Sequence, residues 1–300
     1  MFRNDLNNVH ARYCGKKRMV YNLLLTNLFY PLTSVRHLSP KKHCKTLNSP
    51  DNNTAFKRIS SLLIVLPVCF LFFSMFFSGI ASAATTVYVG IDSASGTVNY
   101  QCDGTNDQIE INKALDYIDN LGGGTVYLRG PNTYWIDDTI YIGSNTVLTG
   151  DTGAEIKLVS HASWSSDKPL ISNSGSADDI TIAGFTIDGN SEYQGVSLGK
   201  GYYNLIYFVG ADNTEVSDMR LEWGCGDGLK IKKSKNIKFI NNDVYNLGHD
   251  ALYAMGCSNV EHAYNTICTR TNSACRYSDG CTDSTIHDNL IYSSLSGGST

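Results

Sequence analysis

Hydrophobic residues follow three patterns along the chain, and each predicts a different kind of element. An unbroken apolar run covers residues 62–81. Helical spacing follows, where Asn106 or Asp107 can cap a helix and the glycines from Gly122 end it. The apolar positions of this helix are Ile109, Ile111, Ala114, Leu115 and Ile118. Beyond residue 124, short β-rich runs alternate with Gly, Asn, Asp and Ser, which predicts strands and turns.

The β-rich runs repeat at an interval of about 23 residues. Asparagines recur at this interval, at Asn242, Asn265 and Asn289. Apolar positions recur in the same way, at Leu229, Leu252 and Cys275. Such self-similarity indicates a solenoid, and the L-x-x-L-x-L frame of leucine-rich repeats is absent. Three short strands and three turns per period predict an all-β fold, a right-handed parallel β-helix whose N-terminal edge the helix caps. The asparagines are expected to form a stacked turn ladder.

Charge divides the chain into two unequal parts. Residues 1–60 carry eleven Lys and Arg against Asp5 and Asp51, which leaves thirteen basic and twenty-six acidic residues, a net charge of about −13, for the remainder. Because phosphate binding needs a basic surface, this acidic body argues against a nucleic-acid partner. Residues 1–58 are predicted to be a basic N-terminal extension without a fold of its own.

The apolar run has the flanks of an export signal. Lys57 and Arg58 precede it and small residues around Ala83 follow it, so residues 59–84 are predicted to be a signal peptide or membrane anchor. Residues 62–81 are long enough to span a bilayer if cleavage does not occur. The protein is therefore expected to be secreted or held at the cell surface, and to meet the membrane only through this segment.

The β-helix domain is assigned to residues 85–300. The chain stops in the middle of a coil without a capping signal, so we expect the domain to be incomplete at its C-terminal end. Six cysteines follow the predicted cleavage point: Cys102, Cys225, Cys257, Cys268, Cys275 and Cys281. In an exported domain they permit disulfides, whose pairing the sequence leaves open. The Cys and His spacing of a zinc site is absent, so no metal ligands are predicted.

Residues 103–150, DGTNDQIEINKALDYIDNLGGGTVYLRGPNTYWIDDTIYIGSNTVLTG, resemble the opening segment of the pectate-lyase-like β-helix superfamily. That segment has a D-x-T/N-D helix, a GGGTV strand and a G-x-Y-x-I strand. Within the superfamily, GHDALYAMGCSNV and TRTNSACRYSDG are similar to the cell-surface disaggregatases of methanogenic archaea. This resemblance implies an exported glycoside hydrolase that takes apart a matrix polysaccharide between cells.

A weaker resemblance is to polygalacturonase-type hydrolases, whose coils carry the motifs N-T-D-G-I, G-D-D-C-I-A and G-H-G. Asp227 in CGDGLKI matches the aspartate of the first motif, and Asp250 in GHDALYA matches the second aspartate of the next. His249 replaces the first aspartate of that pair, the general acid of the family. The third coil, TNSACRY, lacks the histidine of G-H-G. The resemblance therefore implies the place of a substrate groove and leaves the mechanism open.

The 23-residue period stacks Asn204, Asp227, Asp250 and Ser273 on successive coils. The two carboxylates are expected about 5 Å apart and to repel each other by about 3 kcal/mol. Such a pair can share a proton, hold a cation or find a basic neighbour. Sharing a proton is what glycoside hydrolysis needs, since one carboxyl must be protonated and the other ionised. His249 is a third candidate acid, because an ordinary histidine pKa is near neutrality.

Side-chain direction decides whether these carboxylates can act on a substrate. Strict alternation puts Asp227 and Asp250 on the inward side, with the leucines two residues later, unless the chain turns a corner before the strand. Gly226 and Gly228 favour such a corner. Asp227, Asp250 and His249 are therefore predicted to be catalytic and to face a groove, with buried turn caps as the alternative.

The same alternation places Lys230, Tyr253 and Arg276 outward in one ladder. A tyrosine ring can stack on a sugar, and Arg can grip a carboxylate, so the predicted substrate is a polysaccharide that contains uronates. Asn204 and Arg270 complete the predicted substrate contacts.

Three functions are compatible with these residues. The first is a disaggregatase-like hydrolase that requires no cofactor. The second is a lyase that abstracts the proton next to a uronate carboxylate, with Arg270 or Arg276 as base or clamp and calcium as a further option on the aspartates. The third is a surface adhesin or envelope protein without catalysis.

Overall fold

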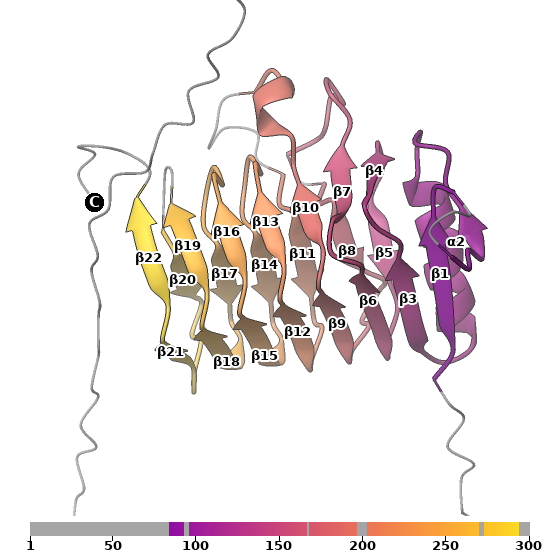
Figure 1. Cartoon of the computed structure of the whole chain (residues 1–300). Coiled ribbons are helices and arrows are strands. Elements are labelled where there is room, and N and C mark those ends of the chain that lie inside the picture. Colours follow the sequence, from indigo (N-terminus) through magenta and orange to yellow (C-terminus); the bar gives the residue numbers. More distant parts are fainter. Residues whose placement is uncertain (1–83, 93–95, 167, 197–202, 270–272, 294–300) are drawn as a thin grey trace, which may run out of the picture. The chain divides into compact units, whose positions relative to one another are not determined.

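Three parallel β-sheets enclose a common core in the computed structural model (Figure 1). The structure describes residues 84–92, 96–166, 168–196, 203–269 and 273–293. The predicted extension 1–58 and the export segment 59–84, apart from Ala84, lie outside these residues. Within the described part of the chain, no helix combines the length and the apolar character that a membrane crossing needs.

The coils contribute strands to three sheets in turn. Sheet 1 contains β5 (Ile140–Ile142), β8 (Ile171–Asn173), β11 (Ile206–Val209), β14 (Leu229–Lys232), β17 (Leu252–Met255) and β20 (Cys275–Ser278). Sheet 2 contains β1 (Thr86–Gly90), β2 (Tyr100–Gln101), β3 (Gly124–Leu128), β6 (Thr146–Gly150), β9 (Ile180–Ala183), β12 (Thr214–Ser217), β15 (Lys235–Ile240), β18 (Ser258–Ala263) and β21 (Thr285–His287). Sheet 3 contains β4 (Asn132–Ile136), β7 (Ala154–Leu158), β10 (Thr186–Asp188), β13 (Arg220–Glu222), β16 (Asp243–Tyr245), β19 (Thr266–Thr269) and β22 (Leu290–Ser293). A short 3-10 helix, η2 (Ser191–Tyr193), follows β10. Neighbouring strands run parallel, and the predicted right-handed parallel β-helix is confirmed.

Paired residues on neighbouring strands of sheet 1 are 23 residues apart between β11 and β20, which is the predicted period. Leu229 pairs with Ile206 on one side and Leu252 on the other, and Leu252 pairs with Cys275. Alternate residues of β14 are buried, because successive side chains of a strand point to opposite faces. Residues one coil apart therefore occupy equivalent positions above and below each other.

Buried asparagines join successive coils at the corner between sheets 2 and 3. Asn265 Oδ1 accepts a hydrogen bond from the backbone N–H of Asn242 at 2.9 Å, and Asn265 Nδ2 donates to the Phe239 carbonyl at 2.8 Å. Asn289 Oδ1 accepts the backbone N–H of Asn265 in the same way, at 2.9 Å. The predicted turn ladder is confirmed, and it pairs backbone groups that a corner would otherwise bury without partners.

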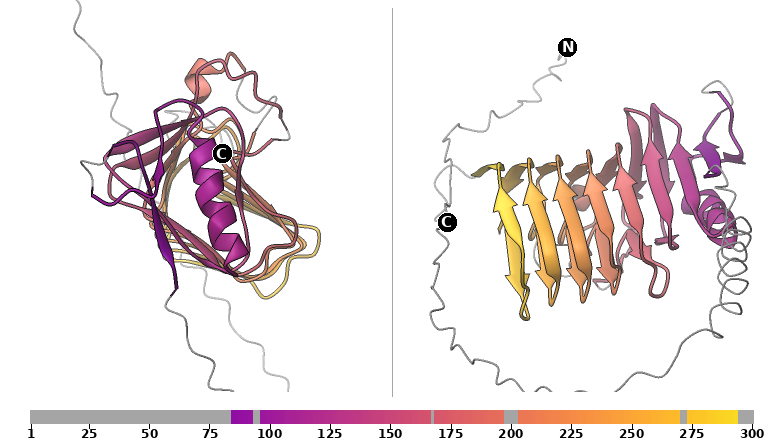
Figure 2. Two further views of the ribbon diagram at one scale, coloured as in Figure 1. Left: turned by 90° about the vertical axis from the view of Figure 1, so that its right-hand side faces the viewer. Right: turned by 90° about the horizontal axis from the view of Figure 1, so that it is seen from below.

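Helix α2 (Gln108–Asn120) lies across the N-terminal end of the solenoid, as the left view of Figure 2 shows. Its polar side chains pair with the backbone of the first coil. Asn112 Oδ1 accepts the N–H of Tyr141 at 2.9 Å, and Asn112 Nδ2 donates to the Thr139 carbonyl at 3.0 Å. Gln108 Oε1 accepts the backbone N–H of Asp137, and Gln108 Nε2 donates to the Asp137 carboxylate. The helix thus replaces a missing coil, and the predicted cap is confirmed.

Two details of this helix differ from the prediction. Asp107 holds the N-cap position but makes no side-chain hydrogen bond into the helix. Its carboxylate instead accepts the backbone N–H groups of Gly104 and Trp135. Ile109 is 47% exposed, because the helix turns Gln108, Ile111 and the later apolar positions toward the solenoid.

Replacing Asn112 with alanine is expected to lower the free energy of unfolding by about 1–2 kcal/mol, since the Tyr141 N–H and the Thr139 carbonyl both lose their partner. Urea unfolding monitored by circular dichroism measures the difference. Lys113→Ala on the exposed side of the same helix is the control, with an expected change below about 0.5 kcal/mol. Equal effects of the two variants would contradict the role of Asn112 at the strand edge.

Candidate functional site

Aromatic and cationic side chains alternate along the outer face of sheet 1. The members of this tyrosine–cation row occupy paired positions on neighbouring strands; they are Tyr207, Lys230, Tyr253 and Arg276. Lys230 Nζ lies 5.4 Å from the Tyr207 ring centre and 5.5 Å from the Tyr253 ring centre. Arg276 Cζ lies 5.0 Å from the Tyr253 ring centre. Cation–π contacts therefore run through the whole row.

The ladder expected from Lys230, Tyr253 and Arg276 has the predicted geometry, and Tyr207 extends it by one strand. The signal for Tyr207 is in the sequence, because it precedes Lys230 by one 23-residue period. Farther along the same face, Ser172 and then Tyr141 follow Tyr207, and Tyr141 is 50% exposed. The outer face of sheet 1 thus offers ring surfaces along several strands.

The predicted column of Asn204, Asp227, Asp250 and Ser273 forms the corner that leads into sheet 1. The side chains of Asn204, Asp227 and Asp250 each accept a hydrogen bond from the backbone N–H one coil further on. The donor–acceptor distances are 3.0 Å from Asp227 to Asn204 Oδ1, 3.0 Å from Asp250 to Asp227 Oδ1 and 3.1 Å from Ser273 to Asp250 Oδ1. The stacking inferred from the period is therefore present.

The predicted outward direction of the two carboxylates is wrong. Asp227 is 3% exposed and Asp250 is fully buried, and Asn204 is 7% exposed. The corner before the strand exists, but its backbone N–H groups need acceptors, and the carboxylates turn toward these donors rather than toward the solvent. Asp227 and Asp250 thus occupy the turn-cap positions that were the alternative, and Asn204, which was predicted to contact the substrate, is buried in the same column.

His249 lies between the buried column and the tyrosine–cation row. Its Nδ1 is 2.5 Å from Asp227 Oδ1 and 3.3 Å from Asp250 Oδ2, and its ring centre is 6.4 Å from that of Tyr253. The His249 side chain retains 16% exposure, more than either carboxylate. An imidazole held by a carboxylate at one nitrogen is a common arrangement for proton transfer.

Arg276 links the row to the same buried group. Its Nε lies 3.1 Å from Asp250 Oδ2, while its side chain is 39% exposed. Burial raises the pKa of Asp250 above its ordinary range, and the neighbouring His249 and Arg276 only partly oppose this effect. Arg270, the other predicted arginine, lies outside the described residues.

The group of Asp227, His249 and Asp250 is a candidate for the calcium that the lyase hypothesis allows, because its ligand atoms lie within 4.8 Å of one another. Calcium prefers roughly six to eight oxygen ligands. Here Asp227 Oδ1 already contacts His249 and a backbone N–H, and Asp250 Oδ2 faces the Arg276 guanidinium. These residues are better suited to an internal ion-pair cluster than to calcium.

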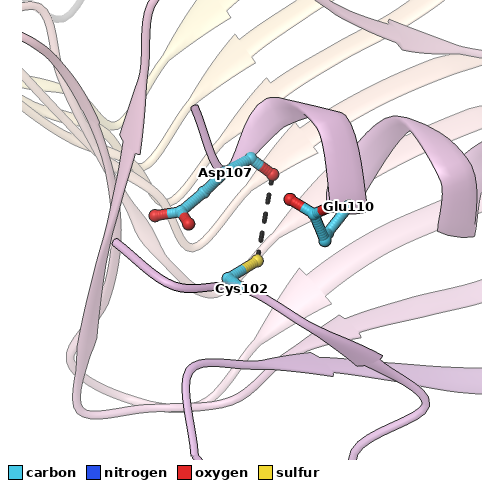
Figure 3. A group of neighbouring side chains, drawn as sticks. All are labelled: Cys102, Asp107 and Glu110. Carbon is cyan, nitrogen blue, oxygen red and sulfur yellow. Dashed lines mark hydrogen bonds between the residues drawn. The ribbon is translucent and has the colours of Figure 1, made fainter. Parts of the chain in front are cut away.

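Two more groups have ligand-type side chains close together. In the first, shown in Figure 3, Cys102 Sγ donates to the backbone carbonyl of Asp107 at 3.8 Å, and the Asp107 carboxylate accepts the backbone N–H groups of Gly104 and Trp135. Burial raises the pKa of the Cys102 thiol, which disfavours the thiolate that a metal requires. In the second group, Lys157 Nζ lies 2.5 Å from Asp188 Oδ2, next to Glu155 and Glu222. Both groups are explained by packing and ion pairing.

Comparison with known proteins identifies the fold of the chain. No protein-family model matches it, and neither does any curated protein sequence. Among solved structures, a candidate glycosyl hydrolase from Parabacteroides merdae matches with a TM-score of 0.53 and 18% identity, over 66% of this chain and 96% of that protein. A family 28 exopolygalacturonase from Yersinia enterocolitica matches with a TM-score of 0.54 and 14% identity, over 69% of this chain.

A third similar structure is a 4-galactohydrolase of galactose-4-sulfate and 3,6-anhydrogalactose-2-sulfate units, with a TM-score of 0.50 and 15% identity. This chain covers 49% of the exopolygalacturonase and 47% of the galactohydrolase, about half of each. At these identities the comparisons establish a shared β-helix fold. The activity must be inferred from the residues of this chain.

Proposed function

We propose that the protein binds and degrades an anionic polysaccharide along the outer face of sheet 1. The tyrosine–cation row is the observation that carries this proposal. Tyr207 and Tyr253 offer ring faces for sugar stacking, while Lys230 and Arg276 offer positive charge for carboxylate or sulfate groups. The row is cationic although residues beyond 60 carry a net charge of about −13, so an anionic ligand is attracted to this face rather than to the rest of the body.

The similar structures support the substrate class. The exopolygalacturonase and the galactohydrolase are named for polymers of uronate and sulfated sugars, and both have the same fold. In a parallel β-helix the outer face of one sheet presents equivalent positions at intervals of about 4.8 Å, which suits an extended chain. We extend the proposal to a disaggregatase-like role at the cell surface, supported by the resemblance of GHDALYAMGCSNV and by the export segment 59–84.

Hydrolysis is the first candidate chemistry. It needs a proton donor at the glycosidic oxygen and a base or nucleophile on the other side of the sugar. His249 is the member of the predicted catalytic set with the most exposed side chain. We assign it the proton transfer, with Asp227 holding its ring and Asp250 acting through His249 and Arg276. Neither buried carboxylate can touch a sugar in this conformation.

β-Elimination is the second candidate, and the burial of the two carboxylates favours it. In this reaction a base removes the proton next to the uronate carboxylate, the glycosidic C–O bond breaks, the departing sugar oxygen takes up a proton from water, and an unsaturated sugar remains at the new end. His249 would accept the proton, while Arg276 and Lys230 would neutralise the carboxylate and so acidify that carbon. Neither step uses a carboxylate of the protein in contact with the substrate.

A double variant, Lys230→Gln with Arg276→Gln, tests the binding face. Affinity for polygalacturonate, used as an anionic probe, is expected to fall at least about tenfold, since two charged contacts are lost. Lys238→Gln on sheet 2 is the matched control, because this lysine is exposed and pairs only with Glu215 among the described ion pairs. Affinity gel electrophoresis measures the binding of both variants to polygalacturonate, and a neutral galactan serves as the second polymer. Unchanged binding of the double variant would refute the proposed face.

Product analysis separates the three functions. New reducing ends without ultraviolet absorbance indicate hydrolysis, and an absorbing unsaturated end indicates elimination. Binding that depends on the tyrosine–cation row, without any decrease in polymer length, would leave the protein as a surface adhesin.

A further inference from the structure

A second column of equivalent positions occupies the corner between sheets 1 and 2. It contains Ala211, Ser234, Cys257 and Cys281 on successive coils. Ser234 Oγ accepts the backbone N–H of Ala211 at 3.0 Å and donates to the Lys232 carbonyl at 2.9 Å. Sulfur replaces this oxygen on the next two coils.

The two cysteines follow the pattern of the serine. Cys281 Sγ lies 3.3 Å from the backbone N of Cys257, and it approaches the Ser278 carbonyl at 3.2 Å. Cys257 Sγ approaches the Met255 carbonyl at 3.5 Å, two residues back as in the serine coil. Both cysteines are present as thiols. Their side chains therefore point in the same direction on adjacent coils.

The backbone spacing at this corner suits a covalent link. Ser258 and Thr282, the residues immediately after the two cysteines, form a parallel β-bridge. Adjacent parallel strands lie about 4.8 Å apart, which falls within the range of roughly 4.4–6.8 Å between the Cα atoms of a disulfide. We propose that Cys257 and Cys281 form a disulfide that joins these two coils when the protein meets a disulfide oxidant.

Access differs between the two thiols and sets the order of the steps. Cys281 is half-buried and lines a surface hollow with Thr282, Asp283 and other residues, whereas Cys257 is 2% exposed. The Cys281 thiolate attacks oxidised glutathione, forms a mixed disulfide and releases one glutathione thiolate. The Cys257 thiolate then attacks the Cys281 sulfur and releases the second glutathione. Two protein thiols lose two protons and two electrons, and one oxidised glutathione becomes two thiols.

The pairing is specific within the described part of the chain. Cys275 begins β20 and pairs with Leu252, the first residue of β17. The end of β17, next to the corner column, is three residues or about 10 Å further along the strand. Cys102 lies beside helix α2 at the other end of the solenoid. Cys225 precedes β14 of sheet 1, and its backbone lies against Gly248 at the corner. Cys268 lies in β19 of sheet 3, where it pairs with Tyr245. None of these four belongs to the column of Cys257 and Cys281.

Peptide mapping of the full chain tests the pairing. The protein is equilibrated with oxidised glutathione without denaturant, alkylated, digested and analysed by mass spectrometry. One linked pair of peptides that contains Cys257 and Cys281 is expected, about 2 Da lighter than the two reduced peptides together. Both residues found alkylated, or Cys257 linked to another cysteine, would overturn the proposal. This measurement on the wild-type protein does not depend on any variant folding.

The double variant Cys257→Ser with Cys281→Ser supplies the matched control, because Ser234 shows that serine fits this column. Proteolysis within residues 257–281 is expected to be at least about tenfold slower for oxidised than for reduced wild-type protein. Oxidised glutathione should leave the double variant unchanged. Equal protection of the variant by glutathione would show that another thiol is responsible and would refute the pairing.

Discussion

Replacing Asp250 with alanine is expected to lower the free energy of unfolding by about 2–4 kcal/mol, a large loss for a single side chain. The Ser273 N–H would lose its acceptor in a buried corner, and the cluster of His249 and Arg276 would lose the carboxylate between them. Thermal or urea unfolding at pH 7 measures the change. Asp243→Ala is the control, because that carboxylate is exposed and pairs with Arg220 at the surface, so a change below about 1 kcal/mol is expected.

Asp250→Asn separates the structural role from the chemical one. The amide oxygen can still accept the Ser273 N–H, so the variant is expected to fold with a loss below about 1 kcal/mol. Because burial raises the pKa of Asp250, the stability that this carboxyl contributes is fully present below its ordinary pKa of 3.8 and is lost as pH rises through the raised pKa. The free energy of unfolding of the asparagine variant should therefore increase relative to that of the wild type as pH rises.

Activity of the same variant decides between two roles. If Asp250 acts only by holding Arg276 and His249, we expect polysaccharide cleavage to fall by about tenfold, mainly through weaker substrate binding. A loss of about a thousandfold in kcat with a folded protein would instead mean that Asp250 exchanges a proton with the substrate. That outcome would require a conformation in which its carboxylate reaches the surface.

The sequence predicted the side-chain directions within strands and the register between coils, because both follow from the repeat. Within a strand, direction follows from alternation, and between coils the register follows from the 23-residue spacing. Lys230, Tyr253 and Arg276 were therefore placed correctly relative to one another. Tyr207 obeys the same rule, because it precedes Lys230 by one period.

The outward direction of Asp227 and Asp250 was predicted wrongly because the corner at Gly226 and Gly228 was expected to turn them to the surface, whereas both stay on the buried side that strict alternation gives. At a corner, a side chain turns to whichever backbone group lacks a partner, and that group is on the next coil. The helix presents a similar difficulty. Asn112 and Gln108 have the polar character of a solvated face, yet they pair with the first coil, a contact visible only when the strand edge is placed.

Protonation of His262 is the second change that is expected to alter the stability of the fold strongly. This residue is fully buried, and neither ring nitrogen has a hydrogen-bond partner. Its ring stacks on Phe239, the residue at the paired position one coil earlier, with 5.5 Å between ring centres and 7° between planes. Burial lowers the pKa of His262 to about 4, with a smaller contribution from His287 nearby. The core therefore accepts this imidazole only in its neutral form.

The β-helix is consequently expected to lose stability as the pH falls from 6.5 toward 4. The folded pKa of His262 lies below its ordinary value of 6.5, so its contribution is fully present above 6.5 and is lost as pH falls through 4. For a shift of this size the loss is about 2 kcal/mol at pH 5 and about 3 kcal/mol at pH 4. Urea unfolding at a series of pH values measures it.

Replacing His262 with phenylalanine, which continues the ring stack of Phe239, is expected to remove this pH dependence. At pH 7 the gain is about 1 kcal/mol, because two unpartnered nitrogens leave the core, and at pH 5 the gain rises to about 3 kcal/mol. His161→Asn is the control: its side chain is exposed, and asparagine tolerates its left-handed backbone (φ 54°). The control should keep the acid sensitivity of the wild type. If the phenylalanine variant kept the acid sensitivity as well, a group other than His262 would have to cause it, because phenylalanine cannot be protonated.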